Sequence, residues 1–198
     1  MFSPRALELE RGWPGKMVGE RVIQLAAQTL QAFFIGGGEA REHAEYALAE
    51  VVLRAPVLHP PSVRLFEGPD DFAFANPAAV IGPGHPVPAL GDLEAHARLT
   101  AVVGLDAIGG FTLMAEVRAP GLAPPKDRDF ALALGPIVVT EKPKTGFDWD
   151  AALDVAARNT RLYPGDLLAA PAHEVVPAGD AVEIAYEGIG TLRCPVTN

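Results

Sequence analysis

The stretch that decides the fold lies near the carboxyl end, where residues 179–196 read GDAVEIAYEGIGTLRCPV. Apolar and polar residues alternate up to Tyr186, a glycine-rich turn follows, and a second run returns to Val196. This pattern is typical of a β-hairpin with one buried face. We expect three glycines to occupy tight turns, where a positive φ or a close backbone approach excludes a side chain: Gly179, Gly188 and Gly190.

Upstream of this hairpin, short apolar runs follow one another with Gly and Pro between them. With 20 Gly and 19 Pro in 198 residues, the chain has too many turn formers for a helical bundle. One short helix is predicted over 149–161, with Leu153, Ala156 and Ala157 on its inner face. The spacing favours a β-roll or sandwich. Strands are predicted at 55–64, 72–77, 79–84, 99–104, 110–117 and 137–140, the last opened by Gly135-Pro136.

The first 54 residues are predicted to form an amino-terminal segment with two helices, packed with residues 55–198 into one compact unit. After irregular strand and turn over residues 1–20, apolar residues recur at helical spacing from Arg21 to Phe34, and Gly36-Gly37-Gly38 ends that helix. A second helix is predicted over 40–51 from its alanine-rich stripe.

Composition excludes several classes of function. The net charge is −9 and no basic stripe occurs, so nucleic acid is not expected as a partner. The single cysteine, Cys194, rules out a disulfide framework. The apolar stretch 99–117 is interrupted by Asp106 and Glu116, so no membrane span is expected. With no signal-peptide pattern at the amino end, we expect a cytoplasmic protein.

Six groups of residues occur in the order and spacing of the fumarylacetoacetate hydrolase family, and the chain resembles that family over about residues 50–198. The groups are Ala55-Pro56 with Pro61-Ser62-Val63-Arg64, Asn76-Pro77 with Gly82-Pro83-Gly84, Gly110-Phe111-Thr112, Arg128-Asp129-Phe130 with Leu134-Gly135-Pro136, Gly165-Asp166, and the carboxyl-terminal residues 179–193. The resemblance implies an α+β, mainly β fold: a mixed β-sandwich roll, here with amino-terminal helices, usually as a homodimer. It also implies a pocket for a small 2-oxo or diketo carboxylate, with Mg²⁺ or Mn²⁺ as cofactor.

At the metal site that the resemblance implies, this chain departs from the family. The family's Glu-x-Glu falls on His96 and Arg98, and its Asp falls on Glu116. Because the guanidinium of Arg98 competes with a metal ion, we expect an Arg98–Glu116 ion pair in place of the metal. More sharply, Arg98 is predicted to fork between Glu94 and Glu116 as the only cation there. The alternative is a shifted set of metal ligands comprising Glu94, His96 and Glu116.

Three further departures from the family concern substrate binding and, in the case of the lid, the activation of water. The family's Lys before Asp-Phe is Arg128, the loop that should hold the substrate carboxylate reads Ala169-Ala170-Pro171-Ala172, and the lid expected between Arg64 and Phe72 is missing. The candidate catalytic residues are therefore Arg98, Glu116 and Arg128. The candidate substrate-binding residues are Arg128, Asp129 and Ala170.

Two functional hypotheses follow. In the first, the protein binds a small carboxylate, or a partner subunit, and metal-dependent hydrolysis is lost or repurposed, so that no cofactor is needed. In the second, it is an active hydrolase, isomerase or decarboxylase on C–C bonds of a 2-oxo acid from aromatic or amino-acid catabolism. That enzyme would use Mg²⁺ or Mn²⁺, or Arg98 or Arg128 in place of the cation.

Overall fold

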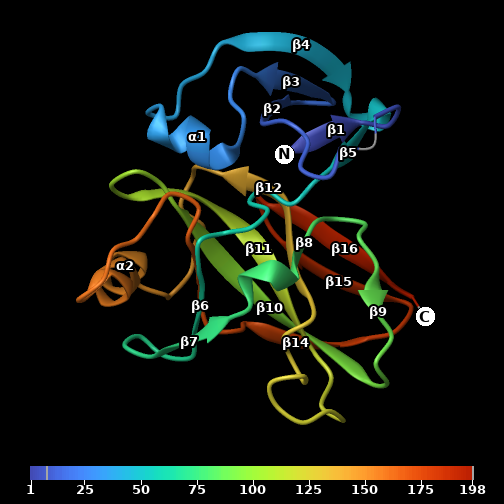
Figure 1. Cartoon of the computed structure of the whole chain (residues 1–198), viewed down its shortest axis with the longest axis vertical. Helices are drawn as coiled ribbons and strands as arrows, with labels where there is room; N and C mark the ends of the chain where they lie inside the picture. Colours follow the sequence, from blue (N-terminus) through green and yellow to red (C-terminus); the bar gives the residue numbers. More distant parts are fainter. Residues whose placement is uncertain (8, 198) are drawn as a thin grey trace.

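The computed structural model describes residues 1–7 and 9–197, and strands dominate it, which confirms the predicted mainly β roll (Figure 1). A curled mixed sheet runs in the order β7-β6-β13-β10-β11-β12-β8, with β14 paired to β10. Its strands are β6 (Val63–Phe66), β7 (Phe72–Ala75), β8 (Val80–Ile81), β10 (Leu93–Val103), β11 (Ile108–Arg118), β12 (Leu132–Val139), β13 (Leu167–Ala169) and β14 (Glu174–Ala178).

The long antiparallel pair β10–β11 forms the middle of the sheet. Because side chains alternate across a strand, one face of β10 presents Ala95, Ala97 and Leu99 to the larger apolar core. The same core includes residues of the carboxyl-terminal hairpin, so this face of the sheet is covered by a second layer. The opposite face of β10 carries His96, Arg98 and Thr100.

The carboxyl-terminal hairpin is confirmed, with β15 (Ala181–Tyr186) antiparallel to β16 (Gly190–Thr197) and β9 (Val87–Pro88) added beside β16. Val182 lies opposite Cys194, and both are buried as the alternation predicts. Gly188 and Gly190 have φ values of 84° and 103°. The prediction for Gly179 is wrong: it has no positive φ, and a Cβ there would meet nothing within 4 Å.

The amino-terminal segment is also mainly β, so the prediction of two helices there is wrong. Residues 40–51 contain the strand β4 (Glu42–Ala47) and a short 3-10 helix (Leu48–Glu50) in place of the predicted α-helix, and of the predicted first helix Leu30–Ile35 is α-helical, as α1. The first part of the predicted first helix is instead the strand β3 (Arg21–Leu25), because Gly19, with a φ of 57°, allows a tight hairpin turn before Arg21. The other strands are β1 (Phe2–Pro4), β2 (Gly15–Val18) and β5 (Val51–Leu53).

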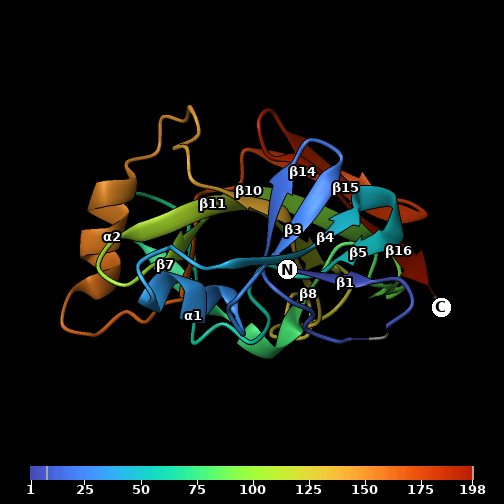
Figure 2. The ribbon, with the colours of Figure 1, turned by 90° about the horizontal axis from the view of Figure 1, so that it is seen from above.

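This segment lies over one end of the roll, as Figures 1 and 2 show from two directions. It has a small core of its own around Phe2, Val22 and Val51. Phe34 of α1 instead joins the core on the second face of the main sheet. A Cβ added at Gly109 would come within 2.7 Å of the Phe34 ring, so this glycine lets the helix approach the sheet.

The predicted short helix is present as α2 (Trp149–Ala157), with the Asp148 carboxylate accepting hydrogen bonds from two backbone N–H groups of its first turn. Its buried residues are Trp149, Ala152 and Ala156. Ala157, predicted on the inner face, is exposed. The strand predicted at 137–140 begins five residues earlier, at Leu132, so Gly135-Pro136 lies inside β12.

Two of the sequence groups that define the resemblance meet in the fold and tie β6 to β13. The Ser62 hydroxyl donates to Asp166 Oδ1 at 2.6 Å, and Asp166 Oδ2 accepts from the Tyr163 backbone N–H at 2.7 Å. Arg64 donates to the Ser62 hydroxyl and lies 3.9 Å from Asp166. These residues therefore hold the scaffold together.

Candidate functional site

The polar face of β10 and β11 gathers the residues that the sequence singled out. His96 lies opposite Glu116 in the antiparallel register, and Arg98 lies opposite Met114. Arg98 and Glu116 are therefore diagonal neighbours on one face, a distance that a long side chain spans easily. Their side chains are 0% and 1% exposed, so they form a buried ion pair, with Arg98 Nε donating to Glu116 Oε2 at 2.9 Å.

Arg98 has three further acceptors around its guanidinium. Nη1 donates to the carbonyl oxygens of Phe66 at 2.9 Å and Ala170 at 3.2 Å. Nη2 donates to Glu67 Oε1 at 2.7 Å and lies 2.9 Å from Glu116 Oε2. Phe66 ends β6 and Ala170 follows β13, so Arg98 uses carbonyls at the ends of two neighbouring strands. The Arg98–Glu116 pair is as expected, but the second carboxylate is Glu67, and the predicted fork to Glu94 is wrong.

Glu116 also binds a second cation, which contradicts the prediction that Arg98 stands alone. Arg118 Nε donates to Glu116 Oε1 at 2.8 Å and Arg118 Nη2 donates to Oε2 at 3.0 Å, so this pair is bidentate. The side chain of Arg118 is 20% exposed, and its Nη2 lies 3.7 Å from Glu67 Oε1. Both oxygens of Glu116 thus accept from arginine, and the network links Glu67, Arg98, Glu116 and Arg118.

The charges of this network shift the pKa values of Glu116, which belongs to it, and of His96, which lies beside it. Burial raises the pKa of the Glu116 carboxyl, but the hydrogen bonds from Arg118 and the charges of Arg98 and Arg118 outweigh it, so its pKa lies below the ordinary 4.5. Burial lowers the pKa of the His96 imidazole, and the positive charge of Arg118 lowers it further. At neutral pH, Glu116 is therefore ionised and His96 is neutral.

The lowered pKa of Glu116 predicts that the free energy of unfolding decreases at acid pH. Its contribution is fully present above pH 4.5, the ordinary value, and is lost as the pH falls through the lower folded pKa. Urea unfolding measured from pH 7 to pH 3 should show this loss in the wild type. Glu116→Gln should remove it, because the amide does not titrate. Parallel pH curves for the two proteins would contradict the assignment.

His96 and Glu94 lie beside the network. His96 Nε2 is 3.6 Å from Glu94 Oε2 and is buried without a hydrogen-bond partner among the residues that the structure describes. The Glu94 side chain is 46% exposed, and it lies opposite Arg118 in the strand register. Glu94, His96 and Glu116 are thus neighbours along one sheet face, but the first is at its solvent edge and the third is already held by two arginines.

The remaining sequence candidates are in the loop between β11 and β12. Arg128 Nη2 pairs with Asp127 Oδ2 at 3.0 Å, and its side chain is 46% exposed. Asp129 pairs with Lys126 at 2.9 Å. In the part of the chain that the structure describes, neither forms a hydrogen bond or ion pair with Arg98 or Glu116, whereas Ala170 contributes its carbonyl oxygen to Arg98. The structure therefore gathers Arg98, Glu116, His96 and Ala170, and places Arg128 and Asp129 apart from them.

Sequence reasoning missed Glu67 and Arg118. A signal existed for Arg118, because it stands two residues after Glu116 and must share its face of β11. None existed for Glu67, which reaches Arg98 through the turn between β6 and β7, 31 positions away in sequence.

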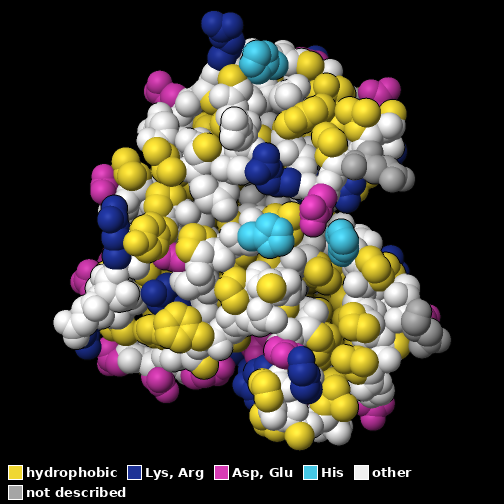
Figure 3. All heavy atoms as spheres, in the orientation of Figure 1, with side chains coloured by type: hydrophobic (Ala, Val, Ile, Leu, Met, Phe, Trp, Pro, Cys, Tyr) yellow, Lys and Arg dark blue, Asp and Glu magenta, His cyan; other side chains and the backbone are white. Residues whose placement is uncertain are grey.

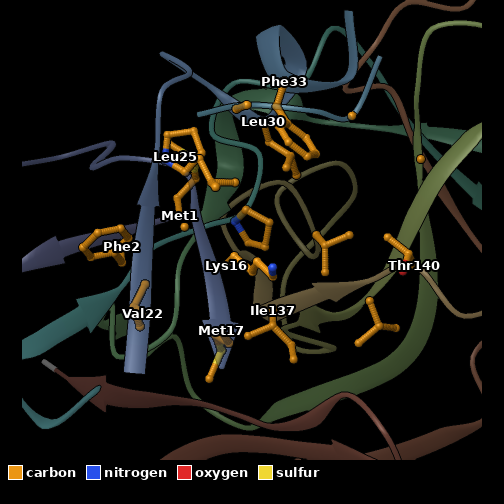
Figure 4. A pocket seen from close by; sticks show the side chains of 18 of the residues that line it. Met1, Phe2, Lys16, Met17, Val22, Leu25, Leu30, Phe33, Ile137 and Thr140 are labelled. Carbon is orange, nitrogen blue, oxygen red and sulfur yellow. The ribbon is translucent and has the colours of Figure 1, made fainter. Parts of the chain in front are cut away.

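Two cavities lie elsewhere in the molecule. The larger, of about 800 Å³, lies between the amino-terminal segment and β12, where Figure 4 shows mainly apolar side chains with Lys16 among them. The second, of about 520 Å³, is lined by Val139 and by residues 141–144 and 186–189. Neither is lined by Arg98, Glu116 or Glu67. In Figure 3, the Lys and Arg side chains on the visible face are scattered and form no continuous stripe.

Comparison with solved structures identifies the architecture. The chain is similar to maleylpyruvate hydrolase from Sphingobium sp. SYK-6, with a TM-score of 0.76 and 20% identity over 94% of this chain and 96% of that one. It is also similar to 5-carboxymethyl-2-hydroxymuconate delta-isomerase from Mycobacterium smegmatis, with a TM-score of 0.72 and 22% identity over 93% and 94%. The chain has the fumarylacetoacetate hydrolase fold.

A third structure with the fumarylacetoacetate hydrolase fold is 2-keto-3-deoxy-D-arabinonate dehydratase with magnesium and 2,5-dioxopentanoate, at a TM-score of 0.75 and 16% identity over 99% of this chain and 97% of that one. The Sphingobium hydrolase is also known with manganese(II) ion and pyruvate. No family model matches the sequence, and no curated protein matches it as a relative. Within residues 1–7 and 9–197, no helix is long and apolar enough to cross a membrane.

The residues around Arg98 and Glu116 do not fit the divalent metal ion that the resemblance implies. Mg²⁺ and Mn²⁺ require several oxygen ligands at close range. Here both oxygens of Glu116 accept from guanidinium groups, and Arg98 lies between Glu116 and Glu67. A metal ion would have to displace a buried cation and then face a second one, Arg118.

Proposed function

We propose that this protein binds a small 2-oxo or diketo carboxylate without a metal ion, with guanidinium groups supplying the positive charge, and that metal-dependent hydrolysis is lost. The observation that carries this proposal is the buried contact of Arg98 with Glu116 and Glu67, next to Arg118. Arginine is well suited to the role because its planar fork matches a carboxylate and it stays charged at any physiological pH.

The chemistry of the site supports binding more than turnover. A permanent cation can attract the carboxylate of a ligand, but it has no open coordination position and cannot lower the pKa of a bound water as a metal does. His96 Nε2, which is buried and has no hydrogen-bond partner within the described part of the chain, adds one polar group beside the arginines that a small ligand can use. Pyruvate, bound by a structural neighbour, is a suitable first probe.

The test is a calorimetric titration with pyruvate, first in EDTA and then in excess Mn²⁺. The affinity should agree within about twofold between the two, because the positive charge comes from the protein. Arg118→Met should weaken binding about tenfold or more, the worth of one charge-assisted hydrogen bond. Arg193→Met, which removes an exposed arginine paired with Glu183, is the matched control and should bind as the wild type does.

An active enzyme remains the competing hypothesis, and the same titration separates the two. Pyruvate binding that requires Mn²⁺, together with metal-dependent cleavage of an acylpyruvate, would reject the proposal. The homodimer implied by the resemblance stays a prediction, and light scattering at about 21 kDa rather than twice that mass would reject it. The expected cytoplasmic location and the division at residue 54 also stay predictions.

A further inference from the structure

We infer that Glu67 occupies the place of the ligand's carboxylate in the free protein, so that a small monocarboxylate binds by displacing this side chain from Arg98 and Arg118. The inference rests on the proposed function, and it adds that the Glu67 carboxylate competes with the ligand's carboxylate for the two arginines. Its starting point is that a carboxylate already lies against the two arginines: Glu67 Oε1 is 2.7 Å from Arg98 Nη2 and 3.7 Å from Arg118 Nη2.

The four acceptors of Arg98 differ in how easily they can be exchanged. Glu116 is 1% exposed, and the carbonyls of Phe66 and Ala170 belong to residues that are 0% and 4% exposed. Glu67 has a side chain that is 55% exposed. An incoming carboxylate can therefore reach Arg98 from solvent only where Glu67 now lies, at Nη2.

The backbone around Glu67 allows this exchange. Glu67 follows β6 and begins the short turn to β7, which is the edge strand of the sheet. The turn is closed by one recorded backbone hydrogen bond, from Glu67 N–H to the Asp71 carbonyl at 3.1 Å. The Phe66 carbonyl stays fixed on Arg98. The Glu67 side chain can thus turn toward water while the strand pairing of β6 remains in place.

Charge balance specifies the class of ligand. Arg98 and Arg118 carry two positive charges and Glu116 one negative charge, so these three side chains together have a net charge of +1 when Glu67 is displaced. Two more carboxylates lie further out: Glu94 is half-exposed, and Asp127 pairs with Arg128. A monoanion restores neutrality, as Glu67 does in the free protein. A neutral ester of the same acid offers no such compensation. The ligand class is therefore a small monocarboxylate, and its affinity is reduced by competition with an anchored carboxylate of the same chemistry.

The experiment compares pyruvate binding by the wild type and by Glu67→Gln, using calorimetry in EDTA. The amide oxygen can still accept from Arg98, so the buried guanidinium keeps a partner while the competing charge is lost. We expect Glu67→Gln to bind pyruvate about tenfold or more tightly than the wild type. Asp70→Asn is the matched control, because Asp70 is an exposed acid of the same turn with no recorded contact to either arginine. It should change the affinity less than twofold.

Three results overturn the inference, and they differ in what they say of the proposed function. Equal pyruvate affinity in wild type and Glu67→Gln, lost in Arg118→Met, would leave carboxylate binding intact and reject the role of Glu67. An equal gain in Asp70→Asn, or for methyl pyruvate in place of pyruvate, would assign the effect to the turn's charge or to another site. No binding by any variant would reject both proposals.

A crystal structure of the wild type with saturating pyruvate gives an independent readout that does not depend on a variant. The expected result is a pyruvate carboxylate within hydrogen-bond distance of Arg98 Nη2, with the Glu67 side chain turned to solvent. Pyruvate bound elsewhere, with Glu67 still on Arg98, would overturn the inference.

Discussion

Replacing Glu116 by Ala should destabilise the protein by about 3–5 kcal/mol, the range for removing one partner of a buried ion pair. Arg98 is 0% exposed and would keep a single carboxylate partner, Glu67, at the solvent edge. Its Nε would lose Glu116 Oε2, the acceptor that it has among residues 1–7 and 9–197. Urea unfolding at pH 7 measures the loss, as a lower midpoint at unchanged slope.

Two controls separate the ion pair from the general effect of a substitution. Glu94→Ala removes a carboxylate from the same sheet face, but one that is half-exposed, and should cost less than about 1 kcal/mol. The double variant Arg98→Met/Glu116→Leu removes both charges of the buried pair and should be less destabilised than Glu116→Ala, because Arg98 is no longer left buried without Glu116. It should not reach wild-type stability, because the Phe66 and Ala170 carbonyls lose their donor and Arg118 loses Glu116. A Glu116→Ala protein as stable as Glu94→Ala would contradict the account.

The second large effect is expected at Trp149, where Trp149→Ala should cost about 3–5 kcal/mol. Its indole is 0% exposed and packs edge-on against Phe111 at 5.2 Å and Phe147 at 4.9 Å between ring centroids. Phe147 in turn packs against Phe66, whose carbonyl holds Arg98. The aromatic cluster therefore supports the end of β6 as well as α2. Thermal or urea unfolding gives the measurement.

The indole nitrogen of Trp149 provides a finer distinction. Nε1 is buried and no residue from 1–7 or 9–197 accepts a hydrogen bond from it, so Trp149→Phe removes an unsatisfied donor while it keeps most of the aromatic contact. We expect Trp149→Phe to cost no more than about 1–2 kcal/mol. Tyr163→Ala, at a half-exposed aromatic residue, is the surface control and should have little effect. If Trp149→Phe were as unstable as Trp149→Ala, the indole would have a partner that this account omits.

The carboxyl-terminal hairpin was predictable because its signals are local. Alternation from Ala181 to Tyr186 and the glycines at 188 and 190 determine both the strands and the turn, and the register follows from the turn. The residues around Arg21 carry a hairpin signal too, at Gly19. The helical spacing of Ile23, Leu30 and Phe34 obscured it, because a strand and a six-residue helix placed in series reproduce that spacing.

Residues 40–51 were misassigned for a different reason. Alanine-rich spacing favours a helix, but β4 pairs with β3 along Glu42–Ala47, and that pairing joins segments about twenty residues apart. Strand formation there depends on a partner that local propensity does not include. The same holds for β14, which completes the sheet beside β10 and was not predicted as a strand.

The candidate site also has a part that the sequence could predict and a part that it could not. The Arg98–Glu116 pair could be predicted because the resemblance places both residues at the family's metal-ligand positions, and in the structure they lie on one face of adjacent strands. The fork to Glu94 was wrong because the guanidinium points toward the ends of β6 and β13, where the Phe66 and Ala170 carbonyls accept from it. Glu67 enters only through the fold, since a short hairpin brings it there.

The most direct test of the central claim, that guanidinium groups have replaced the metal, is Mn²⁺ binding followed by electron paramagnetic resonance. Wild-type protein should leave the six-line signal of free Mn²⁺ undiminished. Arg98→Glu/Arg118→Ala removes both cations, places a new carboxylate beside Glu67 and Glu116, and should reduce that signal. Stoichiometric Mn²⁺ binding by the wild type at micromolar concentration, lost in Glu116→Gln, would contradict the account.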